Sequence, residues 1–194
     1  MKILEIRRHS LTKKGPSRGT GSSLSQEGVE LARAIGAGLQ HFDHVATSDI
    51  PRSAETAIAM GFSVTELIAD LCPSDPDLYI EVGHHERWGW DHPFQRFAEL
   101  VARSSQTARL GQMQVDTWQS VLEKLPDNGR ALIISHGRVI ESGFVTLFPN
   151  ADFRQWGSPF RHCEGARIRA ETSGVFSFEL LRVDEETRLG VAQH

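Results

Sequence analysis

Residues 3–10 read Ile-Leu-Glu-Ile-Arg-Arg-His-Ser, a short apolar run that stops at two arginines and a histidine. Residues 131–137 repeat the pattern, because Ala-Leu-Ile-Ile is followed there by Ser-His-Gly. Apolar runs of this length are typical of parallel strands buried on both faces. Open α/β sheets bind ligands beyond the carboxyl ends of such strands. The two stretches therefore predict a mostly parallel sheet with a site that receives Arg8, His9 and His136.

A third predicted strand, at residues 44–48, leads into a segment suited to binding an anion. Pro51 fits the first turn of a helix, where its missing N–H costs nothing, and Arg52 then lies at the positive end of the helix dipole. An arginine in that place is unfavourable unless an anion such as phosphate binds beside it. Arginine matches phosphate oxygens with its planar fork of donors, and histidine can serve as a covalent nucleophile. The pattern points to phosphate chemistry.

Four segments together resemble the histidine phosphatase superfamily, the phosphoglycerate mutase-like group. They are Arg8-His9, the Leu-Ser-x-x-Gly pattern of residues 24–28, the Ser-x-x-x-Arg-x-x-x-Thr-Ala segment of residues 48–57, and Ser135-His136-Gly137. The resemblance implies that His9 is the phosphorylated nucleophile and that Arg8, Arg52 and His136 hold the phosphoryl group.

The chain departs from the family pattern in two places. Ser10 stands where the family usually has glycine, which bears on the shape of the pocket. No clear asparagine follows His9 within a few residues, and family mutases tend to use one. We therefore expect a phosphatase that hydrolyses phosphomonoesters, or a phosphoprotein, through a phosphohistidine on His9. The alternatives are phosphoglycerate mutase-type phosphoryl transfer and a non-catalytic phospho-ligand-binding module.

A leaving alkoxide needs a proton, so the site should include a general acid. The resemblance implies a carboxylate between Arg52 and the second histidine. Residues 86–91 read Glu-Arg-Trp-Gly-Trp-Asp and resemble the family segment that follows this acid. Glu86 is the favoured candidate, with Glu81 and Asp91 as alternatives.

The cluster His84, His85, Glu86 and His92 invites comparison with metal sites. Its spacing matches no recognised ligand pattern. We expect these side chains to line the substrate cleft or to face solvent. The catalytic scheme requires no metal and no cofactor.

The pattern and the resemblance together predict a single domain, residues 1–194, with the three-layer α/β/α sandwich of the phosphoglycerate mutase-like fold. Ser25 is a good N-cap for the first helix. Residues 166–171 and 175–180 read as an antiparallel addition to the sheet, and residues 70–93 read as an irregular connection. Helices are expected at residues 25–39, 52–61, 94–103, 107–125 and 139–148.

Composition limits the classes of partner. The net charge of -4 and the pI near 6.1 argue against a general nucleic-acid or membrane-surface role. No apolar run is long enough to cross a bilayer, and the N-terminus carries no signal-peptide pattern. Cys72 and Cys163 lie far apart and are expected to be reduced thiols, which fits a cytoplasmic protein. The expected partner is a phosphorylated small molecule or phosphoprotein.

Overall fold

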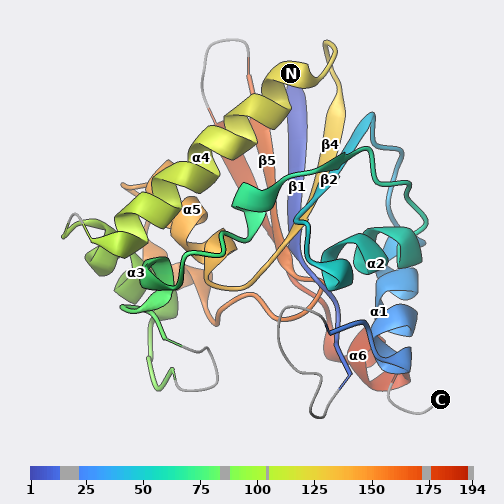
Figure 1. The fold of residues 1–194 in the computed structure, drawn as a ribbon, viewed down its shortest axis with the longest axis horizontal. Coiled ribbons are helices and arrows are strands. Elements are labelled where there is room, and N and C mark those ends of the chain that lie inside the picture. The colour runs from blue at the N-terminus through green and yellow to red at the C-terminus, as the bar shows by residue number, and fades with distance from the viewer. Residues whose placement is uncertain (14–21, 84–87, 104, 172–175, 192–194) are drawn as a thin grey trace.

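A six-stranded sheet forms the centre of the computed structural model, which describes residues 1–13, 22–83, 88–103, 105–171 and 176–191 (Figure 1). The strand order is β3-β2-β4-β1-β5-β6. The strands are β1 (Lys2–Arg8), β2 (His44–Thr47), β3 (Glu66–Leu67), β4 (Arg130–Ser135), β5 (Gly165–Ala170) and β6 (Phe176–Leu181). The first four strands in this order pair in parallel, whereas β5 runs antiparallel to both β1 and β6. The predicted mostly parallel sheet with an antiparallel addition is confirmed.

Helices cover both faces of the sheet, so the three-layer prediction is also confirmed (Figure 1). One layer holds α3 (Pro93–Val101), α4 (Gln106–Lys124) and α5 (Val139–Leu147); the other holds α1 (Gln26–Gly36), α2 (Pro51–Ala59) and α6 (Glu185–Val191). Short 3₁₀ turns occur at η1 (Ala69–Leu71), η2 (Pro76–Tyr79) and η4 (Phe153–Trp156). The sequence pattern did not predict β3 or α6. Strand β3 has only two residues, too few to show a period.

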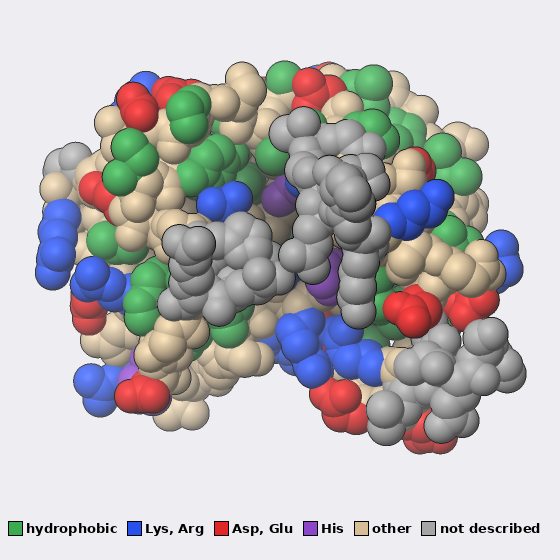
Figure 2. Space-filling model, turned by 60° about the horizontal axis from the view of Figure 1, so that its bottom comes forward, with side chains coloured by type: hydrophobic (Ala, Val, Ile, Leu, Met, Phe, Trp, Pro, Cys, Tyr) green, Lys and Arg blue, Asp and Glu red, His purple; other side chains and the backbone are tan. Residues whose placement is uncertain are grey.

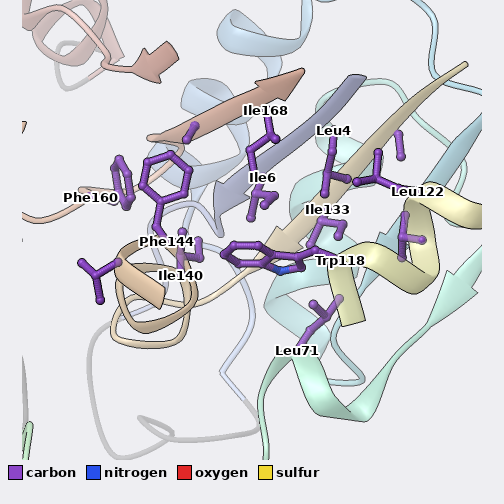
Figure 3. Packing of buried hydrophobic residues seen from close by; sticks show 14 of the residues in the cluster. Leu4, Ile6, Leu71, Trp118, Leu122, Ile133, Ile140, Phe144, Phe160 and Ile168 are labelled. Carbon is purple, nitrogen blue, oxygen red and sulfur yellow. The ribbon is translucent and has the colours of Figure 1, made fainter. Parts of the chain in front are cut away.

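Alternation along β4 distributes its apolar side chains between the two helical layers. Ala131 and Ile133 belong to the cluster formed with α4 and α5, whereas Leu132 and Ile134 pack with α1 and α2. Trp118 fills the space between α4 and the sheet beside Ile133 (Figure 3). Burial on both faces explains why the strand reads as a continuous apolar run. None of the described helices is both long and apolar enough to cross a membrane.

Two local signals place the helices that border the site. The Ser25 side chain accepts a hydrogen bond from the Gly28 N–H and so caps α1. Pro51 occupies the first turn of α2. Helix α1 ends at Gly36, three residues before the predicted end at residue 39. Glycine is required at position 36 because a side chain there would collide with the backbone of Met60.

Gly165 provides a test of the close approach of β5 to β1, because a Cβ atom there would collide with the Ile6 carbonyl oxygen. That oxygen belongs to a central strand and cannot move without disturbing the sheet. We expect Gly165→Ala to lower the free energy of unfolding by about 1–3 kcal/mol, the usual range for overpacking, as measured by urea denaturation. Gly190→Ala in α6 is the matched control: a Cβ there meets no atom within 4 Å, so its stability should be unchanged or slightly higher. Equal midpoints for both variants would contradict the described packing.

Candidate active site

The carboxyl ends of β1, β2 and β4 bring together the four residues that the sequence predicted to bind phosphate. His9 follows β1 and His136 follows β4, and their ring centroids lie 5.0 Å apart. Arg52 reaches both rings from the first turn of α2. Arg8, the last residue of β1, lines the same cleft as His9 and Arg52. In the view onto this edge of the sheet, histidine side chains lie near the centre of the face, with Lys and Arg side chains close to them (Figure 2).

Hydrogen bonds set the tautomer of His9. Its Nδ1 lies 2.7 Å from the backbone carbonyl oxygen of Ser10. A carbonyl oxygen can only accept, so the proton lies on Nδ1. Arg52 Nε donates to His9 Nε2 at 3.2 Å. Because a guanidinium can only donate, the lone pair of Nε2 accepts this hydrogen bond and the nitrogen carries no proton, as a nucleophile requires.

His136 has a tautomer set in the same way. Its Nδ1 lies 3.2 Å from Arg52 Nη2, so this nitrogen accepts. Its Nε2 then carries the proton and lies 2.7 Å from Ser48 Oγ and 3.1 Å from Ser53 Oγ. Ser48 Oγ donates onward to Ser53 Oγ at 2.9 Å. Both serines were visible in the matched motif, but the sequence assigned no role to either side chain.

Burial and neighbouring charge keep both rings neutral. Burial lowers the pKa of His9 well below 6.5, and His136, Arg8, Arg52 and His162 lower it further. For His136, burial again lowers the pKa well below 6.5, and the positive charges of Arg52, Arg8 and Arg138 add to the effect. At neutral pH, His9 therefore presents its unprotonated Nε2.

A buried carboxylate counterbalances the charge of Arg8. Burial lowers the pKa of Arg8, whereas the negative charge of Glu141 opposes that change. Glu141 is fully buried and accepts hydrogen bonds from the N–H groups of Arg138 and Phe160. Arg8 Nη1 donates to the Phe160 carbonyl at 2.9 Å. Gly137 leaves room for this guanidinium, because a Cβ there would lie 3.2 Å from it.

Arg7, the other arginine at the end of β1, is buried and paired. Its side chain is buried on the opposite side of β1 from Arg8, where Nε donates to Glu5 at 2.7 Å and Nη1 donates to the Cys163 carbonyl. Strand β5 covers this side, and its Arg167 also pairs with Glu5.

Ser10, which stands in place of the family glycine, is turned toward α1. Its Oγ donates to the Gly28 carbonyl at 2.7 Å, and its N–H donates to Thr56 Oγ1 at 2.9 Å. The Ser10 hydroxyl and N–H therefore both form hydrogen bonds that join the loop after His9 to the helices α1 and α2. The serine therefore ties down the segment after His9 without occupying the space between the two histidines.

A cleft of about 870 Å³ extends from Arg8, His9 and Arg52. Its lining includes Arg138 and His162, which the sequence analysis missed. The His162 ring lies 5.5 Å from the His9 ring. The sequence could have indicated His162, because it lies just before the predicted antiparallel strand at residues 166–171, which is β5 in the structure. An antiparallel strand begins at the edge of the sheet where its neighbour β1 ends, which is the edge that holds the site. Cys72 and Cys163 are free thiols, as expected.

The candidates for the general acid lie in different surroundings. Glu86 falls outside the described residues, as do His84 and His85. Glu81 is exposed and accepts hydrogen bonds from Thr107 N and Oγ1 at 2.9 and 2.8 Å. Burial alone raises the pKa of Glu81, but these hydrogen bonds hold it below its usual value. Neither Glu81 nor Asp91 is among the described residues that line the cleft.

Within the described ranges, no group of three His, Cys, Asp or Glu residues is placed to hold a metal ion. His92 is exposed at the start of α3. Three carboxylates do line the cleft wall: Asp49, Asp70 and Asp75, all of them exposed. No local sequence pattern marks these three as candidate acids.

Comparison with known proteins agrees with this geometry. Residues 6–173 match the model of the histidine phosphatase superfamily (branch 1). No curated protein matches the chain significantly in sequence. Among solved structures, the phosphoserine phosphatase of Entamoeba histolytica in complex with 3-phosphoglyceric acid has a TM-score of 0.69, 15% identity, and coverage of 95% of this chain and 98% of the other. A mycobacterial glucosyl-3-phosphoglycerate phosphatase in complex with VO3 has a TM-score of 0.65, 12% identity, and coverage of 95% and 100%. YhfR of Bacillus stearothermophilus has a TM-score of 0.64, 16% identity, and coverage of 93% and 96%.

The lowered pKa values of His9 and His136 predict how stability depends on pH. Unfolded histidines bind a proton near pH 6.5, whereas these two resist protonation in the folded chain. Below about pH 6.5 the unfolded state therefore binds more protons, so the stability present above that pH is lost as the pH falls. The loss should reach at most about 1.4 kcal/mol per pH unit for each histidine, measured as urea midpoints from pH 7.5 to 5. The slope should become shallower in His136→Gln and stay the same in the exposed control His41→Gln.

Proposed function

The chain belongs to the histidine phosphatase superfamily, and from this we propose that it hydrolyses phosphomonoesters through a covalent phosphohistidine on His9. The observation that carries the proposal is the pair of hydrogen bonds on the His9 ring. Nδ1 is protonated and tied to a backbone carbonyl, while Nε2 is unprotonated and directed at the Arg52 guanidinium. A neutral nucleophilic nitrogen facing a phosphate-binding cation is the arrangement that attack on phosphorus requires.

In the first step, the Nε2 lone pair attacks phosphorus, a P–N bond forms, and the ester P–O bond breaks. The leaving oxygen takes a proton from a general acid. Arg52 now donates to both histidines, and a bound phosphoryl group would take over those donors with its equatorial oxygens. Arg8 lies in the same basic surroundings, which would stabilise the charge of the transition state. His136 faces Arg52 through Nδ1 and keeps its Nε2 proton on the side of Ser48 and Ser53.

In the second step, water attacks phosphorus and gives a proton to the carboxylate that the general acid became in the first step, the P–N bond breaks, and inorganic phosphate leaves. The His9 ring returns to its starting tautomer because the Ser10 carbonyl holds the Nδ1 proton throughout. Each step uses only side chains and water, so the scheme calls for no metal or cofactor.

The cleft supports a small molecule as the substrate. Its volume of about 870 Å³ lies within the range of pockets that enclose small ligands, roughly 300–1,000 Å³. The two enzymes named above from Entamoeba and mycobacteria act on, or were solved with, small phosphorylated acids or an oxyanion. We therefore place a phosphorylated small molecule ahead of a phosphoprotein.

His9→Ala should abolish turnover of p-nitrophenyl phosphate, because it removes the Nε2 that acts as the nucleophile in the proposed mechanism. Mass spectrometry of quenched wild-type protein should find a phosphoryl group on His9, and the variant should carry none. The control His41→Ala changes an exposed histidine and should keep wild-type turnover. Activity should persist in excess chelator. Near-normal turnover by His9→Ala would show that His9 is not the nucleophile. Loss of activity in chelator, with recovery when zinc is added, would indicate metal-dependent chemistry.

Glu86→Gln should slow alkyl phosphates much more than aryl phosphates. An aryl phosphate leaves as a stabilised phenolate, whereas an alkoxide needs the proton. General acid catalysis contributes about 10²–10⁴-fold, so a loss of that size is expected on propyl phosphate and little loss on p-nitrophenyl phosphate. Glu81→Gln and Asp91→Asn are the matched comparisons, and neither should show the leaving-group dependence. If one of them does and Glu86→Gln does not, the acid is that residue.

A further inference from the structure

We propose that Arg138 binds a second anionic group of the substrate, so that preferred substrates carry a carboxylate or another phosphate beside the scissile phosphoryl group. This inference rests on the proposed phosphatase function and names the substrate class of the same cleft. Arg138 lies two residues after His136 and lines the cleft that holds His9 and Arg52.

The Arg138 side chain is held in place by uncharged partners. Its guanidinium carbon lies 4.6 Å from the centroid of the Tyr79 ring, and its Nη1 donates to the Gly83 carbonyl at 3.0 Å. Tyr79 is itself fixed by a hydrogen bond from its hydroxyl to the Pro73 carbonyl at 2.9 Å. These contacts orient the guanidinium without neutralising it. An oriented cation loses little freedom when it binds an anion.

Among the described residues, the Arg138 side chain has no carboxylate partner to compete with a ligand, unlike several other arginines. Arg161, Arg167, Arg182 and Arg188 each pair with a glutamate, but Arg138 has no ion pair within the described part of the chain. Its positive charge contributes to the lowered pKa of Arg8, Arg52 and His136, so it acts on the phosphate-binding residues directly. Arg8 and Arg52 already match a dianionic phosphoryl group. Arg138 adds one more positive charge than the scissile phosphoryl group requires.

The carboxylates on the cleft wall do not cancel this charge. Asp49, Asp70 and Asp75 are exposed to solvent, whereas Arg138 is half-buried. The Asp75 side chain also accepts a hydrogen bond from the Asp77 N–H. Solvent screens the exposed carboxylates more strongly than it screens the half-buried arginine.

The backbone at position 138 supports a role for the side chain itself. Arg138 has φ of 74° and ψ of -46°, a region that favours glycine. Its N–H donates to Glu141 and its carbonyl accepts from Ser142, which hold the turn. A glycine would relieve the strain and keep both bonds. Strained positions of this kind concentrate at functional sites, and here the strain directs a guanidinium into the cleft.

The test compares three alkyl phosphates of equal chain length: propyl phosphate, 3-(phosphonooxy)propanoate and propane-1,3-diyl bisphosphate. The wild-type protein should prefer one or both doubly anionic substrates in kcat/KM, chiefly through a lower KM. The carboxylate and bisphosphate arms identify which second anion is bound. Arg138→Met should reduce that preference about 10- to 100-fold, the scale of a charge-assisted hydrogen-bonded pair, and Arg138→Lys should keep part of it.

Arg138→Gly separates recognition from folding. It should unfold at a higher urea concentration than the wild type, because the strain is gone, and yet lose the preference. Arg96→Met changes a half-buried arginine outside the cleft that pairs with Glu99; it is the control and should keep the preference. Equal kcat/KM on all three substrates in the wild type, or an unchanged preference in Arg138→Gly, would overturn the inference. If the inference fails but the wild-type protein still turns over p-nitrophenyl phosphate and carries phosphorylated His9, the proposed function stands. If neither turnover nor phosphorylated His9 is found, the proposed function itself has failed.

Discussion

The parallel register of β1 on β4 is the constraint on which the site depends. It places Arg8 opposite Ser135, and the His9 N–H donates to the Ser135 carbonyl at 2.9 Å. Successive side chains of a strand point to opposite faces, so a slip of one residue would exchange the surroundings of every side chain in β1. Glu5 makes such a slip costly. Its buried carboxylate is paired with Arg7 and Arg167 on one face, and a slip would move the charge into the apolar cluster around Ile6.

Gathering cations at the strand ends has an electrostatic cost, and the fold offsets only part of it. Burial lowers the pKa of both Arg8 and Arg52, which means that their charged forms are held at some expense. The buried carboxylate of Glu141 offsets part of this expense near Arg8, and the two histidines add no charge because they stay neutral. A phosphate dianion would relieve the remainder. Binding of an oxyanion should therefore stabilise the folded chain as well as occupy the site.

The sequence predicted those parts of the fold and site that depend on local signals. Arg8-His9 and His136 each follow an apolar run, Arg52 follows a proline suited to a helix start, and these patterns are visible within a few residues. The contributions of Glu141, Ser53 and Arg138 arise from contacts between segments far apart in the chain. No local period marks Glu141 as the partner of Arg8, because only the folded loop at Phe160 brings them together. The strand pattern leaves open whether Arg7 is paired or solvated, and only the placement of β5 decides between the two.

The C-terminal segment supports the site from behind, although the family match ends at residue 173. Glu164 is buried and receives Arg182 from beyond β6 and Arg188 from α6. Arg188 also donates to the His162 carbonyl at 3.2 Å. The loop so anchored presents the Phe160 carbonyl to Arg8 and the His162 ring to His9.

Breaking a buried ion pair leaves an uncompensated buried charge and is strongly destabilising. The pairs of Glu164 with Arg182 and Arg188 therefore hold the loop in place. Catalysis of phosphoryl transfer depends on donors that are already in place when the charge develops. In the proposed mechanism the tail would therefore act on the site indirectly, by fixing the loop that contacts Arg8 and His9.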